Sequence, residues 1–245
     1  MLLLAGFAAG ALNAIAGGGS FLTFPALVLT GLPAVVANAT NTVALFPGSF
    51  ASAFAYRQGL ARLEGISLKT MVAISVAGGT LGAVLLLITP ERVFVELTPW
   101  LLLFATLMFV FGRHMGRVLR RSVHVGFGSL VAAQFVIAIY GGYFGGGIGI
   151  LMLAALTVFG MHDIHAMNGI KTVLSGCLNG IAVVIFVAAG KVAWREALIT
   201  MVAGLAGGYF GAHYAQRLPA RLVRGIVTAT AVLMTAVFFV RTYWP

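Results

Sequence analysis

The chain has 245 residues, of which 61% are hydrophobic and 8% are charged, and its formal net charge is +10 at pH 7. Soluble domains carry about 25% charged residues, so this composition excludes a water-soluble surface and makes lipid the solvent for most of the chain. The apolar runs are continuous, as in VLMTAVFFV, whereas barrel strands alternate apolar and polar residues. We therefore predict an all-α fold, a polytopic transmembrane helix bundle.

Ten apolar segments follow one another along the chain. They lie at 2–16, 20–31, 34–57, 67–88 and 97–112 in the first half, and at 123–143, 148–160, 164–189, 194–215 and 221–241 in the second. A helix needs about 20 residues to span the hydrocarbon core, so the second segment of each half is too short. Each of these two follows a glycine triplet, Gly17–Gly19 or Gly145–Gly147.

Both triplets are predicted to interrupt the helices, because consecutive glycines weaken a helix. Non-helical backbone at membrane depth is tolerated only beside protein or a watery cavity, and each break could form the tip of a re-entrant hairpin. Close helix packing by glycine is the alternative. Packing is the simpler interpretation for the spaced pairs Gly78/Gly82 and Gly207/Gly211.

The second half of the chain repeats the first. AGGGSF (16–21) recurs as FGGGIG (144–149), NATNTV (38–43) as NGIKTV (168–173), GGTLGA (78–83) as GGYFGA (207–212), and TPER (89–92) as LPAR (218–221). This order predicts two repeats of one membrane body, 1–112 and 123–245, joined by a basic cytoplasmic linker at 113–122. The positive-inside rule does not separate inverted from parallel repeats. A change from one arrangement to the other moves three basic residues to the cytoplasmic side and three others away from it. Inversion is favoured, since short glycine-interrupted segments at matching places are typical of inverted-repeat transporters.

Polar residues inside the apolar segments form two clusters at duplicated positions. One cluster contains Asn38, Thr40, Asn41 and Thr42, and the other contains Asn168, Lys171, Thr172 and Ser175, with Asn179 one turn further. Intramembrane polar residues are costly and usually functional. Lys171 aligns with Asn41, and it either snorkels to an interface or supplies a fixed positive charge to an anion.

The breaks and the clusters together predict a binding site for a small anion. Ser20 stands at a plausible N-cap position, and a helix that restarts after each triplet points N–H groups and its positive dipole end toward the membrane centre. Asn, Thr and Ser side chains beside Lys171 can complete the shell. The predicted substrate-binding residues are Gly17, Gly18, Gly19, Ser20, Asn38, Asn41, Thr42, Gly145, Gly146, Gly147, Asn168, Lys171, Thr172 and Ser175.

Other chemistries find little support in the sequence. His162, Asp163 and His165 could suggest a metal site, but no further cluster of residues supplies a third and fourth ligand. Neither a metal nor a cofactor is therefore expected. GGGS around Ser20 resembles an intramembrane serine protease, but no histidine lies in a clear helical core position to act as base. The carboxylates fall in or near loops, which leaves a proton relay unsupported. The basic residues fit loops that hold orientation, so nucleic acid is not an expected partner.

The segments 16–59 and 145–180, together with the GGTLGA/GGYFGA and TPER/LPAR pairs, resemble the TauE/SafE family of membrane permeases, often called sulfite exporters. The resemblance covers essentially the full chain. It implies transport of sulfur-containing anions such as sulfite, sulfoacetate or other C2 sulfonates. Family members often carry a small or polar residue where Lys171 stands. If this lysine departs from the family pattern, it narrows the range of substrates to a particular anion.

We therefore predict a secondary transporter in the inner membrane, with several membrane passes and no catalytic residues, that binds its anion near the midplane between the repeats. A passive small-anion channel and an intramembrane enzyme are the alternatives. The expected partners are a small anionic substrate and the lipid bilayer, and a homodimer is left open.

Overall fold

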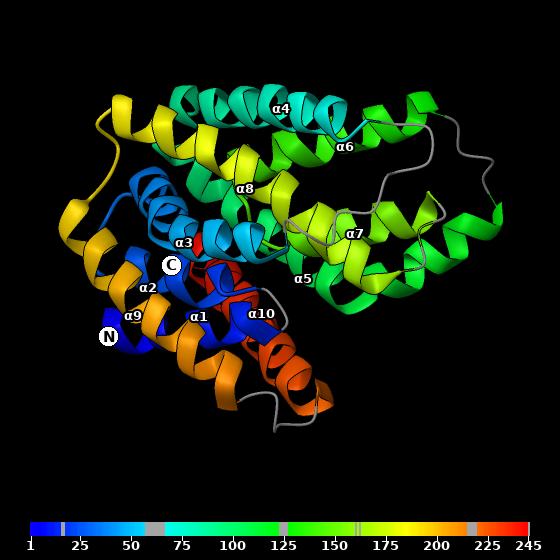
Figure 1. Ribbon diagram of the computed structural model, residues 1–245. Coiled ribbons are helices and arrows are strands. Elements are labelled where there is room, and N and C mark those ends of the chain that lie inside the picture. The colour runs from blue at the N-terminus through cyan, green and yellow to red at the C-terminus, as the bar shows by residue number, and fades with distance from the viewer. Residues whose placement is uncertain are drawn as a thin grey trace.

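The computed structural model describes residues 1–15, 18–56, 67–122, 127–159, 161, 163–214 and 220–244, and every regular element in these ranges is an α-helix (Figure 1). This confirms the predicted all-α fold. The helices are α1 (Leu2–Ile15), α2 (Ser20–Leu29), α3 (Ala34–Tyr56), α4 (Leu68–Ile88), α5 (Glu91–Ser122), α6 (Phe127–Tyr143), α7 (Ile148–Val158), α8 (Ile164–Ala188), α9 (Trp194–Tyr214) and α10 (Ala220–Tyr243).

The predicted segments agree with these helices to within a few residues, apart from α5. The sequence predicted an apolar segment at 97–112 followed by a linker, but α5 starts directly after Pro90 and continues through 113–122. The stretch RHMGRVLRRS contains several good helix formers and no proline. Loss of hydrophobicity therefore ends the membrane-compatible part of the helix without ending the helix itself.

Four helical stretches in the described part of the chain are long and apolar enough to cross a membrane. They are 68–88 in α4, 91–112 in α5, 166–188 in α8 and 225–243 in α10. The helices that flank the glycine triplets, α1, α2, α6 and α7, are apolar but shorter. A membrane location for the chain follows from the long stretches, since such helices match the thickness of the hydrocarbon core.

Both predicted helix breaks are present. Gly18 has φ +93° between α1 and α2, and Gly145 and Gly147 have φ +77° and +73° between α6 and α7. Only glycine adopts such backbone angles readily. A side chain from the preceding helix holds each break: the Asn13 amide oxygen accepts from the Gly19 N–H at 2.7 Å, and the Tyr140 hydroxyl donates to the Gly146 carbonyl at 2.8 Å.

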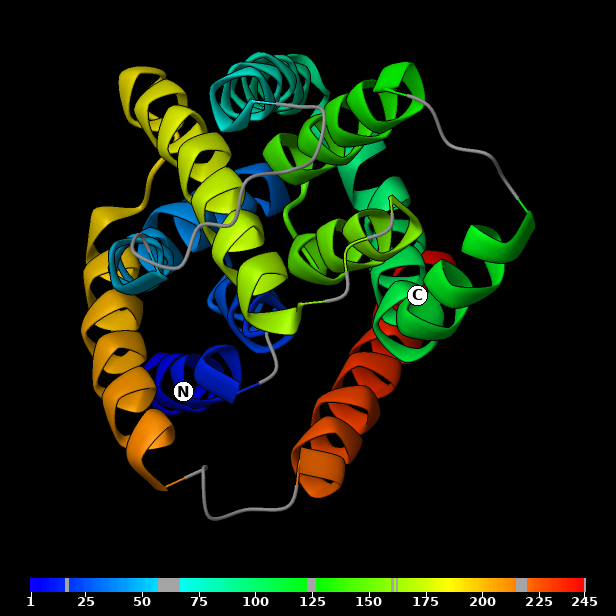
Figure 2. The ribbon, with the colours of Figure 1, turned by 45° about the vertical axis from the view of Figure 1, so that its right-hand side comes forward.

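Two glycine-rich crossings join the halves, α1 with α9 and α4 with α6 (Figure 2). A Cβ at Gly10 would lie 1.9 Å from the Gly204 carbonyl oxygen, and one at Gly82 would lie 2.1 Å from the Ile139 carbonyl oxygen. The backbones therefore touch, as small residues allow in membrane helix pairs. The packing interpretation holds for Gly78, Gly82 and Gly207, since an added Cβ would lie 2.8, 2.1 and 1.9 Å from a carbonyl oxygen of the partner helix. The surroundings of Gly211 lie outside the described residues.

The contacts between the halves come in related pairs. If each helix is exchanged for its counterpart in the other half, the α1–α9 contact becomes α6–α4, and the α3–α9 contact becomes α8–α4; all four contacts exist. The counterparts α5 and α10 run in opposite directions where they pack. Trp100 donates to the Tyr243 hydroxyl at 3.0 Å, whereas Thr106, further along α5, lies 3.1 Å from Thr235, which is earlier in α10.

An aromatic core brings the two breaks together. Phe24 of α2 packs on Phe144, which lies in the second break, with ring centroids 5.6 Å apart. Phe24 also contacts Phe94 of α5 and Phe238 of α10, at 6.5 and 5.8 Å between centroids. The start of α2 is thereby fixed beside the segment that leads into α7.

Candidate substrate-binding cavity

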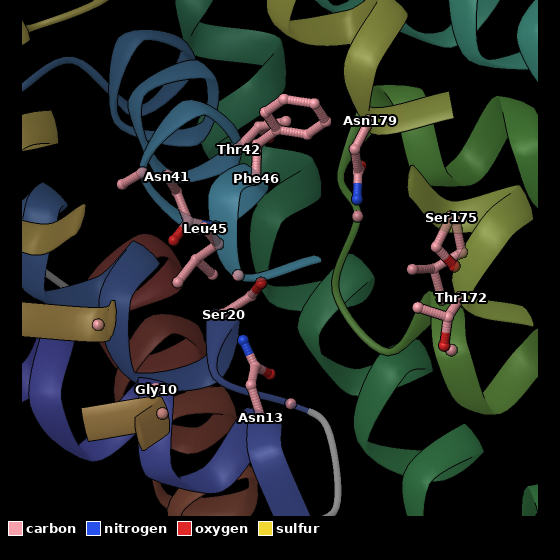
Figure 3. A pocket seen from close by; sticks show the side chains of 18 of the residues that line it. Gly10, Asn13, Ser20, Asn41, Thr42, Leu45, Phe46, Thr172, Ser175 and Asn179 are labelled. Atoms are coloured by element: carbon pink, nitrogen blue, oxygen red, sulfur yellow. The ribbon is translucent and has the colours of Figure 1, made fainter. Parts of the chain in front are cut away.

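A cavity of about 480 Å³ lies between the halves (Figure 3). Its wall comes from the end of α1, the break between α6 and α7, the starts of α2 and α7, and the middle parts of α3, α8 and α9. The predicted site residues that line it are Gly18, Ser20, Asn41, Thr42, Gly145, Gly147, Lys171, Thr172 and Ser175. Gly19, Asn38, Gly146 and Asn168 do not line it, and Gly17 lies outside the described residues.

Both helix starts face this one cavity. Gly18 and Ser20 bring the beginning of α2 into the wall, and Gly147 and Gly149 bring the beginning of α7. Neither start has a side-chain cap hydrogen bond. Two helix N-termini with their positive dipole ends therefore converge on the same space, a combination that favours a bound anion.

The prediction that Ser20 is an N-cap was wrong. The N-cap of α2 is Gly19, and Ser20 is the first helical residue. The left-handed turn falls at Gly18, so the chain has already returned to helical angles at Gly19, with φ −56° and ψ −29°. In this position the Ser20 side chain projects into the cavity instead of capping the helix (Figure 3).

Lys171 lies in the cavity wall with its side chain half-buried. Its ammonium group donates to the Asn168 amide oxygen at 3.0 Å, and its stem lies against Gly149 at the start of α7. Asn168, which does not reach the cavity, therefore orients the lysine. Among the described residues of the wall, Lys171 alone belongs to the charged types, so it sets the sign of the charge there.

Three of the four predicted hydroxyl groups, all except that of Ser20, have their protons engaged elsewhere. Thr42 donates to the Asn38 carbonyl at 3.1 Å, Thr172 to the Asn168 carbonyl at 2.7 Å, and Ser175 to the Met152 sulfur at 3.2 Å. A hydroxyl carries one proton. These groups therefore present lone pairs to the cavity, and donation to an anion would require them to give up a bond they already make.

The asparagines of the first cluster brace the breaks. Asn38 donates from its amide nitrogen to the Tyr143 carbonyl at 2.9 Å, which ties α3 to the end of α6, and its amide oxygen is buried without a partner. Asn41 accepts from the Thr23 hydroxyl, which ties α3 to α2. Asn41 also lines the cavity, whereas Asn38 does not.

The sequence matches the family described as "Sulfite exporter TauE/SafE" over residues 2–238. The chain belongs to this family. A "Probable membrane transporter protein" of Haemophilus influenzae is 29% identical over 242 residues, which are 96% of this chain and 92% of the relative. A "Probable membrane transporter protein ORF9" of Sinorhizobium is 30% identical over 237 residues, covering 95% and 89% of the two chains. In Escherichia coli K12, "Probable membrane transporter protein YfcA" is 26% identical over 238 residues, covering 96% and 87%.

No solved structure matches the chain. The family and these relatives make this TauE/SafE protein a membrane transporter.

Sequence reasoning missed several parts of the cavity wall in this TauE/SafE transporter. Asn13 at the end of α1 lines the cavity, as do Gly204, Gly208 and Tyr209 of α9. Asn13 could have been found, because it is the one polar residue in the apolar segment 2–15 and polar residues in such segments are usually functional. The α9 residues gave no comparable signal, since only the fold brings them beside α1 and α3.

Proposed function

We propose that this TauE/SafE protein is a secondary transporter of small sulfur-containing anions, such as sulfite, sulfoacetate or other C2 sulfonates, across the inner membrane. The observation that carries the proposal is a single cavity into which both helix starts and Lys171 converge. A lysine acts as a point charge for an oxyanion, and helix N-termini add oriented N–H dipoles. The wall is otherwise uncharged among its described residues, so an anion has no carboxylate to oppose it there.

The same proposal includes inverted repeats with the anion bound near the membrane midplane. The antiparallel packing of the counterparts α5 and α10 supports inversion, because a two-fold axis in the membrane plane reverses every helix. The paired contacts between the halves support it as well. In such transporters the substrate lies at the repeat interface, between discontinuous helices near the midplane.

A carrier is favoured over a passive channel by an asymmetry between the halves. Gly208 and Tyr209 of α9 line the cavity, and Tyr209 is 76% exposed. Their counterparts in α4, Gly79 and Thr80, do not line it. A Cβ at Gly79 would lie 3.0 Å from the Leu178 Cβ, so α4 and α8 are in close contact. A channel needs a path through both sides at once, whereas a carrier opens them alternately.

Ligand-induced stabilisation of the purified protein tests the proposal. The melting temperature is measured with sulfite, sulfate, thiosulfate, sulfoacetate, taurine and carboxylate analogues. A ligand at 100 times its Kd stabilises the folded state by about 2.7 kcal/mol. We expect at least one sulfur-containing anion to raise the melting temperature, and counterflow in proteoliposomes to saturate. If none of these anions stabilises the protein, the proposed substrate class is wrong; flux without saturation or counterflow would indicate a channel.

A further inference from the structure

One hydrogen bond fixes which way the Asn13 side-chain amide is oriented. Asn13 lines the cavity, and its amide oxygen accepts from the Gly19 N–H at 2.7 Å. Because the Gly19 group is an N–H donor, the amide atom facing it must be the oxygen. The Asn13 amide nitrogen makes no hydrogen bond within the described part of the chain, and Figure 3 shows the side chain directed toward Ser20.

A second amide in the cavity, that of Asn41, is held by a hydroxyl group instead of a backbone N–H. The Asn41 amide oxygen accepts from the Thr23 hydroxyl, and Asn41 also lines the cavity. The hydroxyl groups of Thr42, Thr172 and Ser175 donate to other atoms. Side-chain donors in the cavity wall therefore include the amides of Asn13 and Asn41, the Ser20 hydroxyl and Lys171. Of these, Asn13 and Ser20 lie at the first helix break.

We propose that Asn13 is a specificity-determining residue that contacts the transported anion through its amide N–H groups. This proposal rests on the anion transport proposed above and deepens it. The first half of the chain supplies oriented neutral donors from Asn13 and Asn41, and the second supplies the charge from Lys171. The Asn13 amide nitrogen carries donors only, so the part of the substrate that lies beside this nitrogen must be a hydrogen-bond acceptor, as a deprotonated sulfur oxyanion is.

Asn13 also holds the break between α1 and α2, so the test must separate the two roles. Asn13→Asp keeps the shape and an oxygen that accepts from Gly19, but it replaces the N–H donors with a carboxylate oxygen. Asn13→Leu removes the donors and the brace together without adding charge. The unliganded melting temperature reports the brace: we expect Asn13→Asp to stay close to the unsubstituted protein and Asn13→Leu to melt lower.

Anion affinity, measured by calorimetry on full-length protein in detergent, reports the contact. We expect Asn13→Asp to bind the stabilising anion at least roughly ten-fold more weakly, the loss of a hydrogen bond to a charged group. Salt screens charges in contact within a cavity only weakly, so the neutral variant Asn13→Leu, and not high salt, separates loss of the donors from charge repulsion. Asn13→Leu should show a loss of similar size.

Three outcomes are decisive. If the unsubstituted protein binds a sulfur oxyanion but Asn13→Asp binds it equally well, Asn13 only braces the break and this inference is overturned. It is overturned as well if Asn13→Leu binds the anion with unchanged affinity while Asn13→Asp binds it more weakly, because charge repulsion alone then explains the weaker binding. If the unsubstituted protein binds none of the tested anions, the proposed function fails and this inference fails with it.

Discussion

The polar residues of the duplicated clusters divide into two groups according to what they touch. Asn38 and Asn168 lie outside the cavity and hold other groups in place, the Tyr143 carbonyl in one case and the Lys171 ammonium in the other. Asn41 and Lys171, one turn further along α3 and α8, line the cavity. The three-residue spacing places both members of each pair on one helix face. Asn168 orients its neighbour Lys171 directly, whereas Asn38 ties α3 to the end of α6.

Lys171 is predicted to bind the anion directly. Lys171→Ala should weaken anion binding by about 1.5–3 kcal/mol, the size of a hydrogen bond to a charged group, and Lys171→Gln should behave similarly. Lys171→Arg keeps the charge but carries a larger, planar head into a compact site, so it should bind with intermediate affinity. Calorimetry at matched salt makes the measurement. Unchanged affinity in both Lys171→Ala and Lys171→Gln would show instead that the lysine snorkels to an interface.

Filling the cavity at the start of α7 should block binding without unfolding the protein. The glycines of the triplets are poor sites for this test: Gly18 has a positive φ, and a Cβ at Gly146 would meet the Phe144 ring at 2.8 Å. Gly149 lies inside α7 and lines the cavity, and a Cβ there makes an ordinary 3.4 Å contact with the Lys171 stem. Gly149→Leu should therefore abolish transport in proteoliposomes while the melting temperature changes little. Normal transport by this variant would mean that the substrate does not use the space beside α7.

At the scale of the helices, the sequence predicted most of the fold because lipid demands continuous apolar runs. It placed α2 and α7 as short helices after the triplets, and the structure has them at Ser20–Leu29 and Ile148–Val158. It missed the length of α5, since a hydropathy pattern ends where charge begins even when the helix continues. Charge counts could not decide the relative direction of the halves, because the basic residues of the two arrangements balance. The relative direction of two helices depends on how they pack, and for α5 and α10 it follows from the contacts of Trp100 with Tyr243 and of Thr106 with Thr235.

The glycine-rich crossings are predicted to be the most sensitive points for folding. Gly10→Ala and Gly82→Ala each place a methyl group about 2 Å from a carbonyl oxygen of the partner helix, and such overpacking costs about 1–3 kcal/mol or more. Gly225→Ala in α10 is the matched control, because nothing lies within 4 Å of the added Cβ. It should be neutral or stabilise by about 0.5–1 kcal/mol, as alanine does in place of glycine in a helix. Melting temperatures of the three variants in one detergent give the comparison; equal effects at all three positions would contradict the packing argument.

At the scale of the whole molecule, the sequence indicated which residues carry chemistry but not which of them meet. Duplication drew attention to Asn41 and Lys171 because they align, and both line the cavity. The remaining wall depends on α9 crossing α1 and passing α3, and these helices are far apart in the sequence. Neither hydropathy nor composition contains that distance information, so Gly204 and Gly208 could not be assigned to the cavity in advance.

Alternating access through exchange of the two halves gives the last prediction. In this structure α4 and α8 are in close contact at Gly79 and Leu178, whereas the counterparts of these residues, Gly208 and Gly48, both line the cavity. If the halves exchange conformations, the first pair separates and the second pair closes. One cysteine pair is introduced between α4 and α8 and another between α9 and α3, in a Cys177→Ser background that removes the native thiol. Each pair reports whether its two helices are in contact.

The Gly79→Cys/Leu178→Cys pair should form a disulfide on mild oxidation, because the Cβ separation of 3.0 Å needs only a small shift to reach the usual range of about 3.5–4.5 Å. Oxidation should stop transport, and reduction should restore it, which shows that the variant folds. The Gly208→Cys/Gly48→Cys pair should cross-link slowly without substrate and faster during turnover, since only the second conformation brings it together. A protein locked at Gly79 and Leu178 that still transports at the unlocked rate would exclude this crossing from the access path. The cross-linking of both cysteine pairs would then reflect a fixed cavity that is open to one side, and the carrier mechanism would lose its structural basis.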